Sequence, residues 1–447
     1  MTTIRILLFL SIAIATFSLT INAQTLDKIA RGQTMDMLKN VQSSIKKDYY
    51  DDKYGGVDLD ARFKTAEEKL KNATSLAQAF SIIAQAVLDM NDSHTRFYPP
   101  ATNQIVEYGL RMKIFGNRAF ITAILPGSDA EQQGLKVGDE ILKLNGFVPT
   151  RSELWKMVYF YYTLSPQTKL TLDLKTPTGE LKQNIVNAKI TELKRVVSLS
   201  SSVDFAEAVR EGDRRSSGSE HYFKEIGNTF IWKMPSFVID PKEIPGLVAR
   251  ARGKQFLILD LRGNGGGYVV ALEKLAGFFF DKDTKIADLK GRKKMDPQMA
   301  KTEGQNAFKG NVIVLIDSTS GSASEIFARL MQIEQRGVVL GDRSAGAVMQ
   351  SQSVRFDAGV STSINYGMNL TMADVIMTDG KSLEHIGVEP NIVIIPSGSD
   401  LADRRDPVLA AALELTGYKV DSAAAGKIFP PEKIEERRSN FAVRLSF

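Results

Sequence analysis

Two segments in the second half of the chain share one order: a short continuous apolar run, a turn of small residues, and an apolar helix-like stretch. Residues 256–261 lead through glycines into residues 268–280, and residues 312–316 lead through serines into residues 323–335. Continuous apolar runs of this length are typical of strands buried on both faces. A strand followed by a helix, repeated, predicts a partly parallel sheet covered by helices. We therefore expect an α/β domain over residues 222–420, whose last helix begins at Pro407 after the N-cap Asp406.

The first part of the chain has a different pattern. Leu76, Phe80, Ile83 and Val87 recur at helical spacing, so residues 24–101 are expected to be helical. Short β-like runs separated by turn signals then predict a small β-rich module with one or two helices, with strands expected at residues 111–115, 119–125, 140–144 and 169–174. The fold class is therefore α+β and multidomain. The remaining boundaries that we expect are the β-rich module at 102–193, a serine-rich linker at 194–221 and a C-terminal tail at 421–447.

The N-terminus has the pattern of a secretory signal peptide. Arg5 is followed by a short apolar run, and Ala23 ends a sequence of small residues that fits a cleavage site. No later run reaches the roughly 18 apolar residues that a membrane-spanning helix needs. We expect residues 1–23 to be removed and the mature chain to be exported, either to a periplasm or out of the cell.

Composition limits the available chemistry. The chain has no Cys and three His, so thiolate nucleophiles, thiolate metal sites and disulfides are excluded. A His-rich zinc site is disfavoured, and we expect no metal and no cofactor. The net charge of +5 is small for 447 residues and is spread along the chain. It does not favour a nucleic-acid partner.

The serine turn over residues 317–325 joins the second buried strand to its helix. A serine at such a turn, here Ser322, lies where backbone N–H groups and the helix dipole favour developing negative charge. That location suits a nucleophile. The alternative is purely structural, because Ser322 and Glu325 also match a capping box.

The glycine turn over residues 263–267 has two interpretations. Its spacing does not match the phosphate-binding motifs, because Tyr268 stands where a further Gly is required. Glycines let the backbone approach a ligand closely and expose its N–H groups. The turn is therefore either an oxyanion site or a tight structural turn.

His is the side chain best suited to take a proton from Ser near neutral pH. His94 stands in a polar cluster after a predicted helix, although such a cluster is also typical of a helix cap. His385 is a weaker candidate in a loop, and His221 is expected to be exposed.

Together these segments resemble the clan of carboxyl-terminal processing peptidases and tricorn-core serine peptidases. The resemblance rests on LRGNGGG at residues 261–267 and SGSASEI at residues 320–326. It implies a crotonase-like α/β peptidase domain. The β-rich module resembles a PDZ domain, in which Tyr108, Gly109 and Leu110 are similar to the loop that binds a peptide carboxylate.

The resemblance also implies the catalytic residues. One branch of the clan pairs Ser with a Lys about 25 residues later, but that position is Ala347 here. The other branch uses Ser and His, which implies Ser322 as nucleophile and His94 as base. It further implies Ser93 and Glu384 beside the base, with Glu389 as the alternative to Glu384. Ala323 and either Gly265 or Gly266 would form the oxyanion hole.

The function that this implies is an exported serine endopeptidase acting on unfolded or C-terminally recognised polypeptides. Its partners would be polypeptides with a free C-terminus, and the oligomeric state stays open. Activity is expected to fall as the pH drops through the His pKa, about 6.5 if unperturbed. Two alternatives stand beside it: a catalytically inactive relative of the same fold that binds peptides or small molecules, and an acyl-CoA enzyme, which an exported location disfavours.

Overall fold

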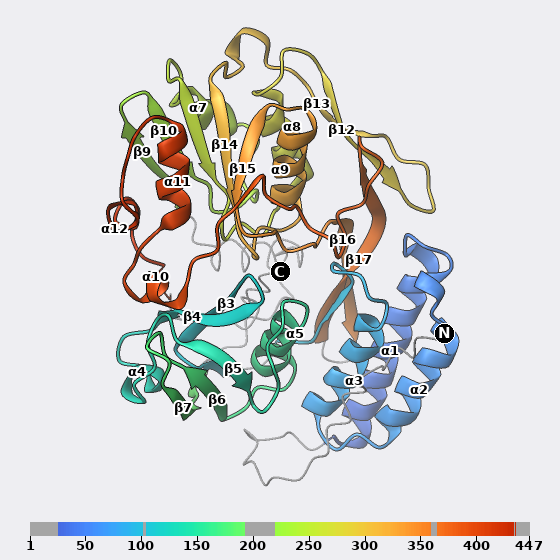
Figure 1. Ribbon diagram of the computed structural model, residues 1–447. Helices are drawn as coiled ribbons and strands as arrows, with labels where there is room; N and C mark the ends of the chain where they lie inside the picture. The colour runs from blue at the N-terminus through green and yellow to red at the C-terminus, as the bar shows by residue number, and fades with distance from the viewer. Residues whose placement is uncertain (1–25, 102–103, 193–219, 359–363, 433, 435–447) are drawn as a thin grey trace, which may run out of the picture.

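The computed structural model describes residues 26–101, 104–192, 220–358, 364–432 and 434, and Figure 1 shows its helical, β-rich and α/β parts. The expected signal peptide and all but the last two residues of the expected linker lie outside these residues. None of the described helices combines the length and apolar character needed to cross a membrane. The mixed, multidomain fold class is confirmed.

The N-terminal part is a bundle of three helices. Its elements are α1 (Lys28–Asp48), η1 (Tyr54–Gly56), α2 (Leu59–Lys71) and α3 (Leu76–Leu88). Helix α3 begins after Ser75, whose hydroxyl accepts a hydrogen bond from the Gln78 N–H at 3.2 Å. Such a bond satisfies one of the free N–H groups in the first turn of a helix. The apolar faces of the three helices form one core.

The β-rich part is a five-stranded antiparallel sheet in the order β3-β4-β5-β6-β7, so β3 lies at an edge. A helix packs against it and continues into a π-helical turn. The elements are β3 (Leu110–Phe115), β4 (Arg118–Ile124), α4 (Asp129–Gln132), β5 (Glu140–Leu144), α5 (Leu154–Tyr159), η2 (Phe160–Leu164), β6 (Lys169–Lys175) and β7 (Leu181–Asn187). Strands β2 (Gln104–Glu107) and β8 (Lys189–Glu192) pair beside it. The four predicted strands are confirmed, and β7 was not predicted.

The α/β part contains a six-stranded sheet in the order β18-β15-β14-β11-β10-β9, parallel except for β9. One face of the sheet packs on α8 and α9 and the other on α11. The strands are β9 (Tyr222–Ile226), β10 (Thr229–Lys233), β11 (Phe256–Asp260), β14 (Asn311–Ile316), β15 (Gly337–Gly341) and β18 (Ile392–Val393). The helices are α7 (Ile244–Ala249), α8 (Val269–Gly277), η3 (Gly304–Asn306), α9 (Ala323–Ile333), α10 (Gly398–Ala402), α11 (Pro407–Leu415) and α12 (Ser422–Ala425).

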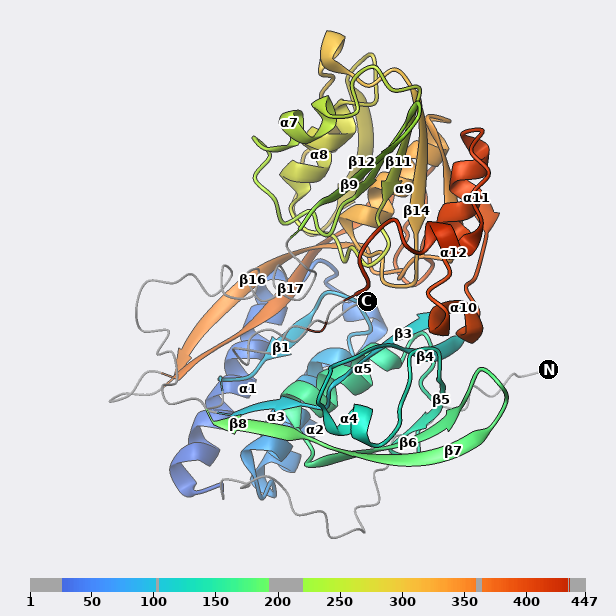
Figure 2. The same ribbon diagram turned by 90° about the vertical axis from the view of Figure 1, so that its left-hand side faces the viewer.

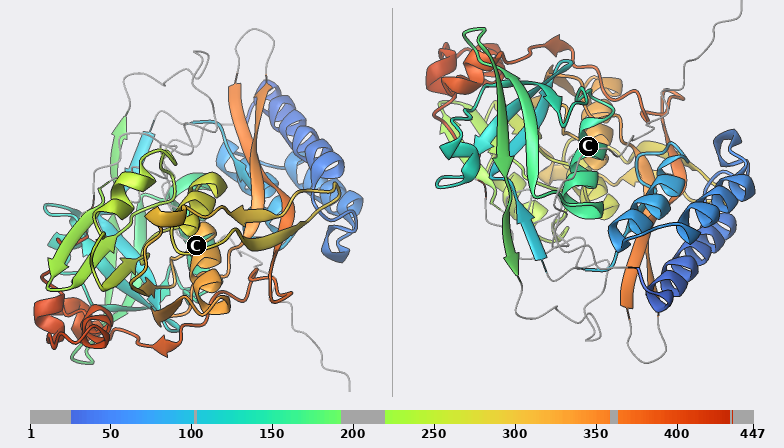
Figure 3. Two further views of the ribbon diagram at one scale, coloured as in Figure 1. Left: turned by 90° about the horizontal axis from the view of Figure 1, so that it is seen from above. Right: turned by 90° about the horizontal axis from the view of Figure 1, so that it is seen from below.

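A second sheet joins the α/β part to the helical bundle. It consists of β12 (Thr284–Lys290), β13 (Gln298–Ala300), β16 (Met349–Ala358), β17 (Ile364–Met377) and β1 (Arg96–Tyr98). Figures 2 and 3 show the long β16 and β17 strands alongside α1, and residues of β17 belong to the core of the bundle. Strand β1 pairs with β17, with Arg96 opposite Asn369. This pairing brings the segment around His94 to the α/β part.

Candidate active site

The glycine and serine turns lie side by side because they follow two neighbouring parallel strands. Strands β11 and β14 pair in register, with Asp260 opposite Leu315, so both turns leave the same edge of the sheet. Ligands of open α/β sheets bind at this edge. The Asn264 carbonyl accepts hydrogen bonds from the Gly321 N–H at 3.0 Å and from the Ser324 hydroxyl at 2.9 Å. The glycine turn and the serine turn are therefore held together by hydrogen bonds.

Gly266 lies close to the serine turn. A Cβ atom there would lie 2.7 Å from the Cβ of Ser322, at a φ of +98°. Glycine is favoured at such a position because it has no Cβ and adopts positive φ freely. The Gly266 N–H donates to the Asn264 side-chain oxygen at 2.9 Å. The Gly265 N–H has no hydrogen-bond acceptor among the described residues.

Ser322 caps α9 in a strained backbone conformation, with φ 52° and ψ −117°. A non-glycine residue in such a region costs about 1–3 kcal/mol and persists only when its surroundings fix it. The Ser322 N–H donates to the Ala347 carbonyl at 2.9 Å and to the Glu325 carboxylate at 3.0 Å. Position 347, where the dyad branch of the clan would have Lys, thus contacts Ser322 with a backbone carbonyl and carries only a buried methyl group.

His94 is held in a turn that follows α3. The Asp92 carboxylate accepts hydrogen bonds from the N–H groups of His94 at 2.9 Å and Thr95 at 2.6 Å. The Thr371 hydroxyl on β17 donates to the same oxygen at 2.6 Å. The polar cluster therefore does form a turn, as the structural interpretation predicts, and this turn fixes the backbone of His94.

The imidazole of His94 lies at the end of a chain of hydrogen bonds that begins at Glu384. The Ser93 hydroxyl donates to Glu384 at 2.8 Å and lies 2.7 Å from Nδ1 of His94. The Ser93 N–H also donates to this carboxylate, at 2.7 Å. Because the single hydroxyl hydrogen of Ser93 goes to Glu384, Nδ1 of His94 must be the donor to Ser93. This leaves the lone pair of Nε2 to act as a base.

Burial keeps the His94 imidazole neutral. Only 8% of His94 is exposed. Burial, and secondly the positive charge of Arg96, lower the pKa of His94 to about 4, while Asp92 acts in the opposite direction. The value of about 6.5, which was expected for an unperturbed His, therefore does not apply at this site. Arg96 donates to the Ser93 carbonyl at 2.9 Å and stacks on the Trp155 ring at 4.2 Å.

The other sequence candidates for these roles lie elsewhere. Glu389 is exposed, so Glu384 is the one of the two that contacts Ser93. His385 is exposed, and its ring nitrogen lies 2.7 Å from the Asn91 carbonyl. Burial raises the pKa of Glu384, and hydrogen bonds from Val348 and Ser93 act against this shift. His221 was expected to be exposed, but it is partly buried and accepts a hydrogen bond from the Trp232 indole N–H at 3.0 Å. Burial lowers the pKa of His221.

Ser322 and the hydrogen-bond network of His94 contact the adjacent residues 347 and 348, respectively, in the segment that follows β15. Ala347 accepts from Ser322, and the next residue, Val348, donates its N–H to Glu384 at 2.9 Å. Among the described residues, the hydrogen bonds of Ser322 do not include His94. Catalytic hydrogen bonds are often long in unliganded enzymes and tighten when substrate binds.

The predicted carboxylate loop opens the edge strand β3. Gly109 has φ +74°, and a Cβ there would lie 2.3 Å from the Cβ of Ser128. Its N–H donates to the Glu107 carboxylate at 3.1 Å. Tyr108 is buried, and its hydroxyl donates to the Gln167 carbonyl at 2.8 Å, so this side chain braces the loop from inside.

A cavity of about 530 Å³ runs from β3 to Ser93 and to the segment of residues 344–347. Strand β3 contributes Leu110 through Ile114, and α5 contributes Leu154, Trp155 and Val158. Ser93 and the 344–347 segment, the direct neighbours of His94 and Ser322, line the same cavity. The edge of the β-rich part and the surroundings of the two turns thus share one space.

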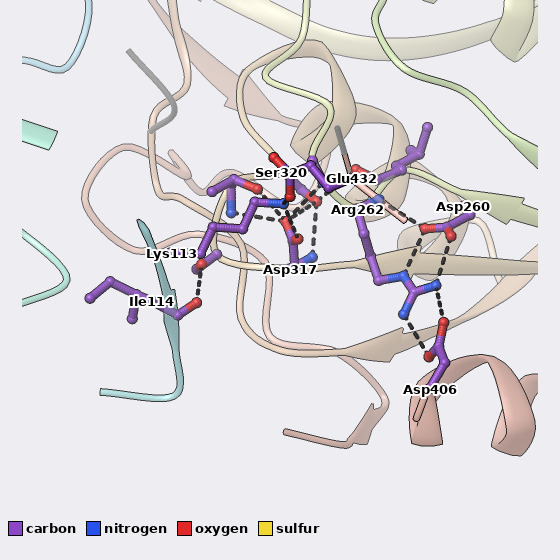
Figure 4. Close-up of polar contacts among 12 residues, drawn as sticks. Lys113, Ile114, Asp260, Arg262, Asp317, Ser320, Asp406 and Glu432 are labelled. Atoms are coloured by element: carbon purple, nitrogen blue, oxygen red, sulfur yellow. Dashed lines mark hydrogen bonds and ion pairs between the residues drawn. The ribbon is translucent and has the colours of Figure 1, made fainter. Parts of the chain in front are cut away.

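The end of β3 contacts the serine turn directly. The Ser318 hydroxyl donates to the Ile114 carbonyl, and the Lys113 ammonium lies 4.0 Å from Asp317 and 3.3 Å from Glu432 (Figure 4). The other oxygen of Asp317 accepts from the Gly263 N–H at 3.1 Å. Strand β3 is therefore linked to both turns.

Sequence reasoning missed several residues that hold the turns. Arg262, within the glycine motif, bridges Asp260 and the helix cap Asp406 with hydrogen bonds of 2.7 to 2.8 Å (Figure 4). Their signals in the sequence were their positions: Arg262 precedes Gly263 in the glycine motif, and Asp317 begins the serine turn. The described residues contain no group of three or more His, Asp or Glu that could hold a metal ion.

Comparisons with known proteins agree with this geometry. Residues 229–394 match peptidase family S41, and residues 104–153 match the PDZ domain. The chain is 24% identical to the tail-specific protease of Haemophilus influenzae over 341 residues, which cover 71% of this chain and 46% of that protein. It is 23% identical to the carboxyl-terminal-processing protease of Synechocystis over 373 residues, or 79% of this chain and 80% of that protein.

Solved structures share the fold at low sequence identity. Mature CPAF, in complex with lactacystin, has a TM-score of 0.62 and 15% identity, with 84% of this chain and 96% of that chain covered. The photosystem II D1 C-terminal processing protease has a TM-score of 0.51 and 17% identity, with 88% and 99% covered. The chain therefore resembles carboxyl-terminal-processing serine peptidases: its residues 229–394 match peptidase family S41, and its residues 104–153 match a PDZ domain.

Proposed function

We propose that this chain is an exported serine endopeptidase that hydrolyses peptide bonds in unfolded or C-terminally recognised polypeptides. Ser322 is the nucleophile and His94 is the general base. The observation that carries the proposal is the hydrogen-bond chain from Glu384 through Ser93 to Nδ1 of His94. A structural cap needs no such chain, whereas a general base needs a fixed tautomer.

The reaction is an acyl transfer in two halves. Ser322 Oγ attacks the peptide carbonyl carbon while its proton moves to Nε2 of His94. The C–N bond then breaks, and His94 returns that proton to the leaving amine. Water attacks the resulting ester with His94 again as base, which releases the carboxylate product and restores Ser322. Glu384 stabilises the transient imidazolium through Ser93.

The oxyanion of the tetrahedral intermediate needs two preorganised N–H donors. We assign the Ala323 N–H, at the first position of α9, and the Gly265 N–H. Gly266 is the less suitable of the two predicted glycines, since its N–H already donates to Asn264. Loss of one such donor typically raises the barrier by about 3–4 kcal/mol.

The substrate docks on the PDZ domain by adding a strand to the open edge of β3. Its C-terminal carboxylate lies at the Tyr108-Gly109-Leu110 loop, where it displaces Glu107 from the Gly109 N–H. An antiparallel strand then runs towards Ile114, which contacts Ser318. Strand β3 lines the same cavity as Ser93 and Ala347, so the upstream substrate chain enters the cavity beside these two residues.

Export rests on the sequence of residues 1–23, which has the charged start, short apolar run and small-residue end of a signal peptide. The substrate class that fits this location is an envelope or extracellular polypeptide.

The test is hydrolysis of an unfolded polypeptide at pH 7.5 by the full chain and by its Ser322→Ala and His94→Ala variants. We expect turnover by the wild type, loss of about 10³-fold or more in each variant, and thermal midpoints within a few degrees of wild type. No turnover by the wild type, with peptide still bound, would favour the inactive binding relative. Full activity of His94→Ala would remove His94 from the mechanism.

A further inference from the structure

The buried carboxylate of Glu325 does more than cap a helix. It lies three residues after Ser322, is 0% exposed, and accepts four hydrogen bonds. One oxygen accepts from the Ser322 N–H at 3.0 Å and from the Ala347 N–H at 2.9 Å. The other accepts from the Ser344 hydroxyl at 2.6 Å and from the Gly346 N–H at 2.7 Å.

Only the bond to Ser322 belongs to a capping box. The other three donors lie 19 to 22 positions later, in the 344–347 segment that lines the cavity. In the same segment, the Ala347 carbonyl accepts a hydrogen bond from the Ser322 N–H. The next residue, Val348, donates its N–H to Glu384. One carboxylate therefore connects the candidate nucleophile with the segment that orients the candidate base.

The four partners require an ionised Glu325. All four act as donors, and the Ser344 oxygen accepts in turn from the Val388 N–H at 2.6 Å, so the Ser344 hydrogen is available for Glu325. A proton on Glu325 would place an O–H against N–H groups. Burial raises the pKa of Glu325 to about 7, and the four hydrogen bonds act against this shift. The N-terminal end of α9 adds a favourable dipole.

Ser322 needs such an anchor because its backbone is strained. Its φ of 52° and ψ of −117° lie in a sparsely populated region. A residue stays in such a region only when neighbouring groups fix it. We propose that Glu325 is the positioning residue of the active site. Its carboxylate holds Ser322 in this conformation and fixes the position of Ser322 relative to the 344–348 segment, which binds Glu384. Glu325 touches no reacting atom. The inference rests on the proposed function of Ser322.

The rival explanation is that Glu325 only stabilises its helix, and the chain contains a matched control. Helix α10 begins with the same device, in which the Asp400 carboxylate accepts from the Ser397 N–H at 2.9 Å. Asp400 also pairs with Arg405, on its own segment. It contacts neither turn of the active site. A helix-capping role predicts equivalent consequences for Glu325→Gln and Asp400→Asn.

The experiment compares Glu325→Gln, Asp400→Asn and the milder Ser344→Ala in the full chain. Two quantities are measured: the second-order rate of labelling by a fluorophosphonate, and amide hydrogen exchange over residues 318–325 and 344–348. For Glu325→Gln we expect labelling and kcat to fall about 100-fold, the loss typical of a reacting group misplaced by about 1 Å, with KM within about twofold. Exchange in both segments should rise about tenfold or more, as for a locally loosened region.

Ser344→Ala removes one donor and should show a smaller loss of the same kind, which keeps the test valid if Glu325→Gln does not fold. Asp400→Asn should leave labelling within about twofold. Between pH 8 and 6 the wild type should lose labelling rate as Glu325 gains a proton, and Glu325→Gln should be insensitive over this range.

Wild-type labelling and exchange in both Glu325→Gln and Ser344→Ala would overturn the proposal, as would equal losses in Asp400→Asn. If the wild type itself is not labelled, the proposed function fails, whereas the exchange data still decide whether Glu325 fixes the two segments.

Discussion

The hydroxyl of Ser93 donates to the carboxylate of Glu384 at 2.8 Å, across 291 positions of sequence. Since a hydroxyl has a single hydrogen, this bond makes Ser93 the acceptor for Nδ1 of His94. Glu384 therefore determines the tautomer of the His94 imidazole although it does not contact the ring. A carboxylate usually contacts such a histidine directly, and here a serine stands between them.

Replacing Glu384 by Gln should impair catalysis without unfolding the protein. One Glu384 oxygen accepts from the Ser93 hydroxyl and the Val348 N–H, and the other accepts from the Ser93 N–H, so an amide must present its NH₂ group to a donor at one of these two positions. We expect kcat/KM to fall about 10²–10⁴-fold, the range associated with general-base assistance. The exposed Glu389 provides the control, because Glu389→Gln should stay near wild type. A larger loss in the control would transfer the role to Glu389.

His94 should remain neutral well below the usual His range. In ¹⁵N-histidine-labelled protein, the three His give few signals, and that of His94 should show hydrogen on Nδ1 and a pKa of about 4. A pKa near 6.5, or hydrogen on Nε2, would contradict the assigned network. The His94→Asn variant identifies the signal.

The same shift predicts a pH dependence of stability. The folded-state pKa of about 4 lies below the unfolded value of 6.5. The unfolded chain therefore binds more protons between these values, and stability falls as the pH drops through this range. Between pH 7 and 5 the contribution of His94 should be about 2 kcal/mol. The free energy of unfolding, measured with urea at pH 7 and pH 5, should change less with pH in His94→Asn than in the wild type. The same pH dependence in both proteins would argue that His94 is not buried.

Gly266→Ala should abolish activity because the added Cβ meets Ser322 at 2.7 Å and the Gly321 carbonyl at 2.8 Å, at a φ of +98°. The serine turn must move, and we expect a loss of at least about 100-fold in peptide hydrolysis. Gly246 in α7 has open space around its Cβ position, so Gly246→Ala is the matched control and should keep full activity. Retained activity in Gly266→Ala would mean that the turns are not in close contact.

Arg151 holds the PDZ domain on the α/β part. It donates to Asp342 at 2.7 Å and to the Arg343 carbonyl at 2.9 Å, and the Gly116 N–H donates to Asp342 at 2.8 Å. Arg151→Ala leaves Asp342 buried without its cation, so the docked arrangement should loosen. We expect KM for a polypeptide with a free C-terminus to rise about tenfold, with kcat for short peptides unchanged.

The exposed Arg118 on β4 pairs with Glu140 within the PDZ domain and serves as control, because Arg118→Ala removes a cation whose ion pair stays inside that domain. An equal rise of KM in both variants would mean that charge, rather than docking, is responsible.

The sequence patterns predicted local elements well. Strand β5 has the predicted bounds Glu140–Leu144, and α11 begins at Pro407 after the predicted cap Asp406, whose carboxylate accepts from Leu409 at 2.9 Å. Both depend on neighbouring residues alone. The helix predicted over 268–280 is shorter, Val269–Gly277, since the apolar residues that follow are buried without being helical.

The parts that could not be predicted depend on long-range pairing. Strands β16 and β17 were not predicted, yet β17 pairs with β1 and so positions the segment that holds His94. The three distant donors of Glu325 and the contact between Ser318 and Ile114 arise only when separate segments meet. The sequence motif therefore identified candidate residues, whereas the relationships among them depend on the fold.

The most direct measurement is the site of covalent modification by a fluorophosphonate, mapped by peptide mass spectrometry in the wild type, Ser322→Ala and His94→Ala. The account predicts one adduct, on Ser322, absent from Ser322→Ala and formed about 10³-fold or more slowly in His94→Ala. An unlabelled wild type, an adduct on another residue, or a wild-type rate in His94→Ala would contradict it.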